Sequence, residues 1–159
     1  MPDMLVKLYD LPPLEPIRQE MEEQKILVRP GLAPEKHIVL AWIEEKFGPG
    51  WASEADVAFA NHPVTCLVAI DEEKKQLAGF ACYEATLRNF FGPVGVDPEY
   101  RGRGIGKALF IESLYGLKQL GYGYCVIGGA GPVDFYAQTA GAIVIEDSMP
   151  GAYRGLLRK

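Results

Sequence analysis

A glycine-rich loop that joins a short apolar strand to a long helix constrains the fold of this chain more than any other feature of its sequence. The strand is expected over residues 90–96 and the helix over 104–120, where large apolar residues recur at helical spacing. The loop and the start of the helix alternate glycines with cationic residues: Arg101, Gly102, Arg103, Gly104, Ile105, Gly106 and Lys107. A strand that runs through such a loop directly into a helix is typical of a domain that combines α and β elements around a ligand site.

The start of that helix is suited to binding an anion. The first turn of a helix leaves backbone N–H groups without partners and carries the positive end of the helix macrodipole. The glycines keep side chains away from the main chain there, while Arg101, Arg103 and Lys107 add positive charge. The residues therefore predict a phosphate or pyrophosphate site.

Two familiar phosphate-binding motifs fail here on spacing. The third glycine of the dinucleotide motif G-x-G-x-x-G falls on Leu109 or Lys107, according to where the count begins. In the P-loop motif G-x-x-x-x-G-K-[ST], Arg101 takes the place of the first glycine and Ala108 replaces the hydroxyl that would hold magnesium. Neither motif identifies the phosphate ligand.

Strands and helices alternate along the rest of the chain, but hairpins occur as well. Apolar runs predict further strands over 4–9, 25–29, 65–70, 77–84, 124–128, 142–146 and 152–157. Helices are expected over 17–24, 34–47, 53–60 with a capping box at its start, and 132–140. We therefore expect an α/β (α+β) chain with a mixed, mostly antiparallel central sheet flanked by helices, and with the strand over 4–9 at an edge.

Length and charge narrow the classes of function. The 159 residues correspond to one domain. A non-specific nucleic-acid binder needs a basic face to displace counterions, and a net charge of -5 argues against both nucleic acid and anionic membranes as partners. No run of eighteen apolar residues predicts a transmembrane helix. Residues 1–10 lack the pattern of a signal peptide.

The cysteines and histidines indicate neither disulfides nor a metal site. Cys66, Cys82 and Cys125 are odd in number and lie within apolar runs, without a CxxC pair. They fit reduced, buried thiols, and we expect a cytoplasmic protein. The chain has two histidines, so a His-based metal site is not expected and no metal is assigned.

One family combines these features. The segment 101–106 matches R/Q-x-x-G-x-G/A and resembles the acyl-CoA pyrophosphate loop of the GNAT acetyltransferase superfamily. Residues 94–98 resemble the end of its fourth strand, and 135–142 resemble its F-Y-x-x-x-G-F/A helix. The order of predicted elements is similar to the whole family fold. The resemblance therefore implies a GNAT domain over 25–159, with 1–24 as an N-terminal extension that packs on it.

The resemblance implies acetyl-CoA as co-substrate and assigns residues to bind it. Backbone amides of the loop and of the first helical turn would hold the pyrophosphate. The exposed main chain of the fourth strand would pair with the pantetheine arm like another strand, where the fourth and fifth strands of this family splay apart. The cofactor-binding residues on this view are Val94, Gly95, Val96, Arg101, Gly102, Arg103, Gly104, Ile105, Gly106 and Lys107.

The resemblance also implies catalytic roles. Tyr136 would protonate the leaving thiolate, and the N–H of Val94 or Val96 would polarise the acetyl carbonyl. A neutral amine is needed to attack the thioester, so a base or a desolvating pocket must remove a proton. The glutamate that the family often places early in the fourth strand is missing, because that position is about Phe90. Glu84 is the nearest alternative base by sequence, and a water relay is another.

We therefore expect an N-acetyltransferase in which a primary amine attacks acetyl-CoA directly within a ternary complex. The acceptor is a small-molecule or peptide amine, and the carboxylates of Glu54, Asp56 and Glu84 favour a cationic one. The alternative is a non-catalytic acyl-CoA-binding sensor or interaction module, which would keep the loop without needing a base. The sequence names neither the acceptor nor the oligomeric state, and leaves open the homodimer common in the family.

Overall fold

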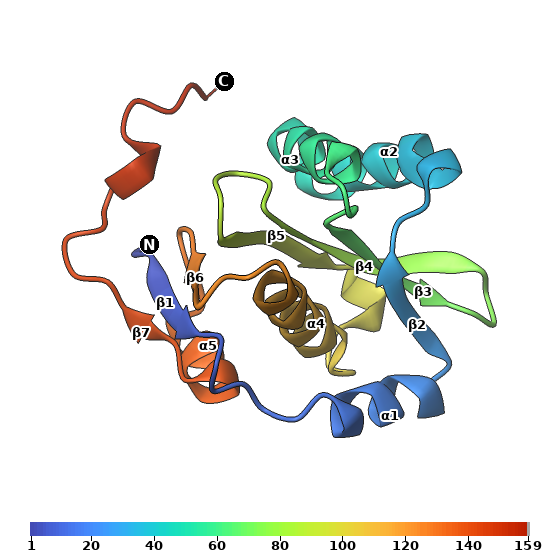
Figure 1. The fold of residues 1–159 in the computed structure, drawn as a ribbon. Helices are drawn as coiled ribbons and strands as arrows, with labels where there is room; N and C mark the ends of the chain where they lie inside the picture. Colours follow the sequence, from blue (N-terminus) through green and yellow to red (C-terminus); the bar gives the residue numbers. More distant parts are fainter. Residues whose placement is uncertain (159) are drawn as a thin grey trace.

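A seven-stranded sheet forms the centre of the protein in the computed structural model, which describes residues 1–158 (Figure 1). The strands are β1 (Met4–Lys7), β2 (Ile26–Pro30), β3 (Cys66–Asp71), β4 (Gln76–Tyr83), β5 (Phe90–Val96), β6 (Tyr124–Ile127) and β7 (Ile143–Val144). The helices are α1 (Glu15–Glu23), α2 (Lys36–Phe47), α3 (Pro49–Ala60), α4 (Ile105–Gln119) and α5 (Val133–Ala140). Single 3-10 turns cover Ala33–Glu35, Pro98–Tyr100 and Gly151–Tyr153.

The strands lie in the order β2-β3-β4-β5-β6-β1-β7. All neighbouring pairs are antiparallel except β5 and β6, which are parallel. A parallel pair needs a crossover connection, and here α4 provides it. The expected mixed, mostly antiparallel sheet flanked by helices is therefore confirmed.

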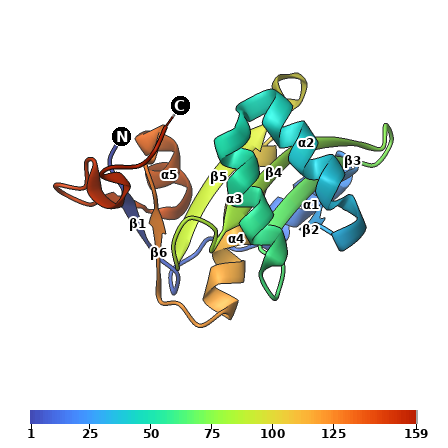
Figure 2. The same ribbon diagram turned by 90° about the horizontal axis from the view of Figure 1, so that it is seen from above.

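Helices cover both faces of the sheet. Helices α2 and α3 lie over one face, and α1, α4 and α5 lie over the other (Figures 1 and 2). Side chains alternate between the two layers, as expected for a strand buried on both faces. In β4, for example, Phe80 packs with α2 and α3, while Ala81 belongs to the larger core around α4. Helix α4 contributes most to that larger core, since eight of its residues are buried.

The N-terminal strand lies inside the sheet. β1 pairs with β6 on one side and with β7 on the other, so the prediction of an edge strand over 4–9 was wrong. Met4 and Val6 are 1% and 0% exposed and join the core around α4. The alternating pattern that predicted a strand reports which side chains are buried. It does not report whether one or both edges of the strand are paired, so it cannot distinguish an edge strand from an interior one. The boundary of the extension at residue 24 stays a prediction, but the segment before it contributes a strand to the shared sheet.

The C-terminal region forms less strand than expected. Of the two strands predicted over 142–146 and 152–157, the structure has only the two-residue β7 and a 3-10 turn. Pro150 has no N–H for a strand ladder, and Gly151 and Gly155 adopt positive φ angles, which break extended structure. The second of these predictions was therefore wrong.

Helix α3 begins four residues earlier than predicted. Pro49 occupies its first position, where a missing N–H costs nothing and the fixed φ favours the helix. Ser53 consequently lies within the helix rather than at a capping box, so that part of the prediction was wrong. None of the described helices has the length and apolar character needed to cross a bilayer.

Candidate functional site

The predicted anion loop leads from the end of β5 to the start of α4. The Asp97 carboxylate accepts the N–H of Glu99 at 2.9 Å and so caps the 3-10 turn after the strand. Gly102 and Gly104 have φ angles of 80° and 81°. This left-handed region is strained for residues with a Cβ, so glycine is needed at both positions. Helix α4 begins at Ile105, directly after Gly104.

Polar contacts from three other segments hold the loop in place. The Tyr100 hydroxyl donates to the Asp71 carboxylate at 2.6 Å and accepts from Gln76 at 2.7 Å. The Arg103 guanidinium lies 5.1 Å from the centre of the Tyr100 ring, and Gln24 donates to the Arg103 carbonyl at 2.8 Å. The bond from Tyr100 lowers the pKa of Asp71. This carboxylate therefore stays ionised at neutral pH and keeps the tyrosine fixed.

The backbone at the start of α4 faces open space. The first intrahelical bond runs from the N–H of Ala108 to the carbonyl of Gly104, so the N–H groups of the preceding turn have no helical partner. A Cβ added at Gly106 would meet only the Val96 side chain, at 3.6 Å, an ordinary contact distance. An anion can therefore approach these amides closely.

Charges of both signs surround this opening. The side chains of Arg101, Arg103 and Lys107 are exposed around the loop, as the sequence predicts. Two carboxylates were not anticipated there. Asp97 is paired with Lys46 at 3.0 Å, whereas the exposed Glu20 on α1 lies beside Gly104. An anion bound at the loop would gain from the cations and would displace the flexible Glu20 side chain.

Beyond its first two residues, β5 has one edge without a backbone partner in the described chain. β6 pairs with it only at Phe90 and Phe91, opposite Val126 and Ile127, and the two strands then diverge (Figure 2). The glycine-rich run 128–131 follows β6 directly. The predicted separation of the fourth and fifth strands of the family thus corresponds here to β5 and β6.

The register of β5 determines which residues face this open edge. The N–H of Asp97 donates to the carbonyl of Ala78 at 2.8 Å, so Asp97 bonds toward β4. Alternate residues of an antiparallel strand bond to the same neighbour. Gly95 therefore also faces β4, whereas the N–H and C=O groups of Val94 and Val96 point to the open edge. Two donors and two acceptors are free there to pair with an extended ligand.

Tyr136 lies at the point where β5 and β6 begin to diverge. Its ring packs at 5.0 Å from Phe110 and 6.3 Å from Phe91, the last residue of β5 that pairs with β6. The residue is 6% exposed, and burial raises the pKa of its phenol. Every fully buried side-chain N or O in residues 1–158 has a hydrogen-bond partner. The Tyr136 hydroxyl has none among these residues, so it must reach solvent-accessible space.

Glu84 lies apart from the other predicted site residues. Its carboxylate accepts the backbone N–H of Asn89 and, at 3.0 Å, the hydroxyl of Tyr122. The first bond closes the turn between β4 and β5, at the end of β5 remote from the anion loop, and the second joins this turn to the loop after α4. Both oxygens of Glu84 thus have structural partners, and its role as a base stays a prediction.

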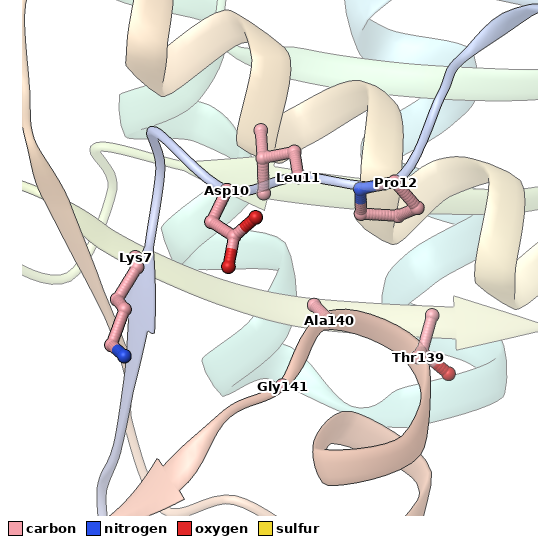
Figure 3. A pocket seen from close by; sticks show the side chains of 7 residues that line it. All are labelled: Lys7, Asp10, Leu11, Pro12, Thr139, Ala140 and Gly141. Carbon is pink, nitrogen blue, oxygen red and sulfur yellow. The ribbon is translucent and has the colours of Figure 1, made fainter.

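Two hollows in the surface contain none of the predicted site residues. A pocket of about 320 Å³ lies between the N-terminal segment and the end of α5 (Figure 3). A groove of about 870 Å³ lies between α2 and the strands β2, β3 and β4. Within residues 1–158, no group of three or more His, Cys, Asp or Glu side chains is placed to hold a metal ion.

Comparison with known proteins gives the family. The model of the acetyltransferase (GNAT) domain family matches residues 62–139, which include β5, the anion loop, α4 and Tyr136. The chain belongs to the GNAT superfamily. The residues matched by the family model include the junction of strand, loop and helix that the sequence analysis identified. No curated protein matches the chain at a significant level.

Solved GNAT structures share the fold at low sequence identity. The glucosamine N-acetyltransferase region of a fungal multi-domain GH3 beta-N-acetylglucosaminidase is 21% identical with a TM-score of 0.73, and the match covers 91% of this chain and 19% of that chain. A GCN5-related N-acetyltransferase from Sphaerobacter thermophilus is 20% identical with a TM-score of 0.68, covering 91% and 48%. The chain thus spans less than half the length of these two proteins.

A third GNAT structure is closer to this chain in length. It is an acetyltransferase from Brucella melitensis in complex with acetyl-CoA, 20% identical with a TM-score of 0.52. The match covers 77% of this chain and 89% of that chain. At such identities the likeness establishes the fold, and the predicted site residues rest on their own geometry.

Proposed function

We propose that this GNAT protein transfers an acetyl group from acetyl-CoA to a primary amine, by direct attack in a ternary complex. The observation that carries the proposal is the free edge of β5, which the anion loop connects to the open amides at the start of α4. A ligand with an extended amide-containing arm and a diphosphate matches both features at once. The acetyl-CoA complex of the Brucella melitensis protein supports the same assignment.

The two binding features suit different parts of acetyl-CoA. The unpaired amides of the first turn of α4, with Arg101 and Lys107 nearby, favour the negatively charged diphosphate. The free N–H and C=O groups of Val94 and Val96 would bond to the amides of the pantetheine arm, as a strand bonds to its neighbour. Gly106 is needed because a side chain there would stand between the amides and the phosphates.

Tyr136 would supply a proton to the sulfur that leaves when the amide bond forms. Burial raises the pKa of its phenol above the ordinary value, so the group is protonated at neutral pH and can act as a donor. Its position where β5 and β6 diverge is the place at which a ligand lying along the open edge would enter the core. The backbone N–H of Val94 or Val96 would stabilise the oxyanion.

A non-catalytic acyl-CoA-binding module is the second candidate. β5 carries no carboxylate, and the two oxygens of Glu84 already accept the N–H of Asn89 and the hydroxyl of Tyr122. A sensor would need the anion loop and the open edge but no base. Its ligand binding would match that of an enzyme, so only turnover separates the two.

A thiol-release assay tests the proposal. Purified protein is mixed with acetyl-CoA and a panel of primary amines that includes glucosamine, a polyamine and peptides with free amino groups. We expect at least one amine to accelerate the release of CoA thiol, with a matching mass increase of one acetyl group on the amine. Acetyl-CoA binding without thiol release for every amine would instead favour the sensor.

A further inference from the structure

Glu54 on α3 is a partly buried carboxylate that forms no ion pair with another of residues 1–158. Its one side-chain hydrogen bond in the described chain comes from the hydroxyl of Thr86, in the turn between β4 and β5. Elsewhere, Glu35, Asp56, Asp97 and Glu112 form ion pairs, and the buried or half-buried Asp71 and Glu84 each accept at least two neutral donors. Removing a carboxylate from water without a cation is unfavourable. The position is therefore suited to a ligand that brings a positive charge.

The surroundings of Glu54 place it over the start of β5. Phe91 faces α4 and Tyr136, so its neighbour Phe90 faces the opposite side of the sheet, where α3 lies. Tyr153, from the C-terminal segment, brings its hydroxyl against Phe90 and Gly128 on that same side. Figure 2 shows α3 and the C-terminal segment on either side of β5. Glu54 and Tyr153 thus flank the strand near the point where β6 leaves it.

The negative charge of Glu54 affects the ionisable groups around it, Tyr153 and Cys82. Burial raises the pKa of Tyr153 to about 12, with further contributions from the negative charges of Glu54 and Asp3. Burial also raises the pKa of Cys82, which lies below α3 in β4 and is affected by Glu54 as well. Tyr153 and Cys82 are therefore neutral at neutral pH. On α3 itself, Asp56 is already paired with Lys36. The other anionic group near Tyr153 is Asp3, whose carboxylate accepts the N–H of Gly129 at 2.9 Å.

We propose that Glu54 binds the ammonium group of the acceptor and removes its proton before acetyl transfer. This inference rests on the proposed function and adds the base that β5 lacks. The carboxylate takes one proton from R–NH₃⁺ and later releases it to water. The neutral nitrogen forms a bond to the acetyl carbon, the carbon–sulfur bond breaks, and the second proton lost by nitrogen passes to the sulfur through Tyr136. The products are the acetylated amine, CoA thiol and one proton.

The two catalytic groups would then act from opposite faces of the sheet. Tyr136 lies on the side of α4 and α5, and Glu54 lies on the side of α3, with the open edge of β5 between them. Such a division brings the amine to one side of the thioester and the proton donor to the other. Burial raises the pKa of Glu54, against the opposing effect of the Thr86 hydroxyl. A raised pKa makes the carboxylate a stronger base toward an ammonium group.

The test compares Glu54→Gln with Glu44→Gln, the same change at an exposed glutamate on the neighbouring helix α2. Glutamine keeps the size and the bond from Thr86 but cannot carry a charge or take a proton. We expect Glu54→Gln to lower kcat/KM for the best amine of the panel by about 100-fold, a typical loss for an acid–base group. The affinity for acetyl-CoA and the melting temperature should stay as in the wild type, and Glu44→Gln should change none of these quantities.

The pH profile gives a readout that a structural role would not alter. Glu54 is active when deprotonated, so kcat/KM of the wild type should rise as pH increases through its pKa, which lies above the ordinary value of 4.5. Glu54→Gln should lose this rise and keep a low, flat rate over the same range. An unchanged rate and an unchanged profile in Glu54→Gln would overturn the inference.

Calorimetry separates this inference from the proposed function. Spermidine, glucosamine and a lysine peptide are titrated into the wild type and into Glu54→Gln, each saturated with CoA. We expect the wild type to bind at least one of these amines and the variant to bind it at least about tenfold more weakly. If the wild type binds an amine through Glu54 but releases no thiol, the proposed transfer fails while the amine site stands. Equal binding by both proteins, or no amine binding by the wild type, would contradict the Glu54 site.

Discussion

Replacing Gly106 by valine should abolish acetyl-CoA binding without unfolding the protein. The position has no positive φ angle, and a Cβ there would meet only Val96 at an ordinary contact distance, so the helix can accept the side chain. Valine also favours a helix slightly more than glycine does. Its two methyl groups would nevertheless stand in front of the amides that hold the diphosphate. We expect affinity to fall by at least about 100-fold, or about 2.7 kcal/mol, in isothermal titration calorimetry.

Gly123→Val is the matched control for this experiment. Gly123 lies on the exposed loop after α4, and a Cβ there would meet nothing within 4 Å. Both variants should keep the circular dichroism spectrum and melting temperature of the wild type, and Gly123→Val should keep its affinity. Gly104 is a poorer choice for the test, because its φ of 81° would strain any replacement. Full affinity in Gly106→Val would show that the diphosphate does not lie at the start of α4.

Removal of the Tyr136 hydroxyl should slow turnover far more than it weakens acetyl-CoA binding. In Tyr136→Phe the thiolate would leave without its proton donor, and the loss of a general acid typically lowers kcat by about 10²–10⁴-fold. The hydroxyl has no hydrogen-bond partner in residues 1–158, so the variant should melt close to the wild type. Steady-state kinetics with the best amine, together with calorimetry for acetyl-CoA, measures both quantities. In the wild type, kcat should not decline from loss of this proton until above pH 10, because burial raises the pKa of the phenol.

Tyr115→Phe provides the opposite control. The Tyr115 hydroxyl donates to the carbonyl of Pro12 at 2.7 Å and so joins α4 to the N-terminal segment. Its loss should reduce the free energy of unfolding by about 1 kcal/mol and leave kcat unchanged. If Tyr136→Phe kept the kcat of the wild type, another group or water would have to protonate the sulfur.

The junction of β5, the loop and α4 was predictable because its signals are local. A strand of seven residues, three glycines and a long amphipathic helix follow one another within thirty residues, and each signal depends on near neighbours in the sequence. The bounds of β5 match the prediction residue for residue, and α4 differs by one residue at each end. The family resemblance rested on this segment, on the helix motif over 135–142 and on the order of elements, and the match of the family model over 62–139 confirms it.

Features that depend on distant pairings were not predictable in this way. The interior position of β1 follows from partners more than a hundred residues away, in β6 and β7. The support of the loop by Asp71 through Tyr100 joins residues 29 positions apart. The bond between Glu54 and Thr86 spans 32 positions. No spacing rule in one sequence indicates such contacts. The sequence therefore indicated Glu54 only as one of three carboxylates near the acceptor, and its proposed role as the base rests on the structure, which places it beside β5.

The central claim is that acetyl-CoA lies along β5 with its diphosphate at the start of α4. An amide NMR titration of the ¹⁵N-labelled protein with acetyl-CoA tests it most directly, because it reports on each backbone N–H separately. The account predicts the largest shifts at Gly104, Gly106 and Lys107, with further shifts at Val94 and Val96. Shifts confined to the groove between α2 and β2, or to the pocket beside α5, would contradict it.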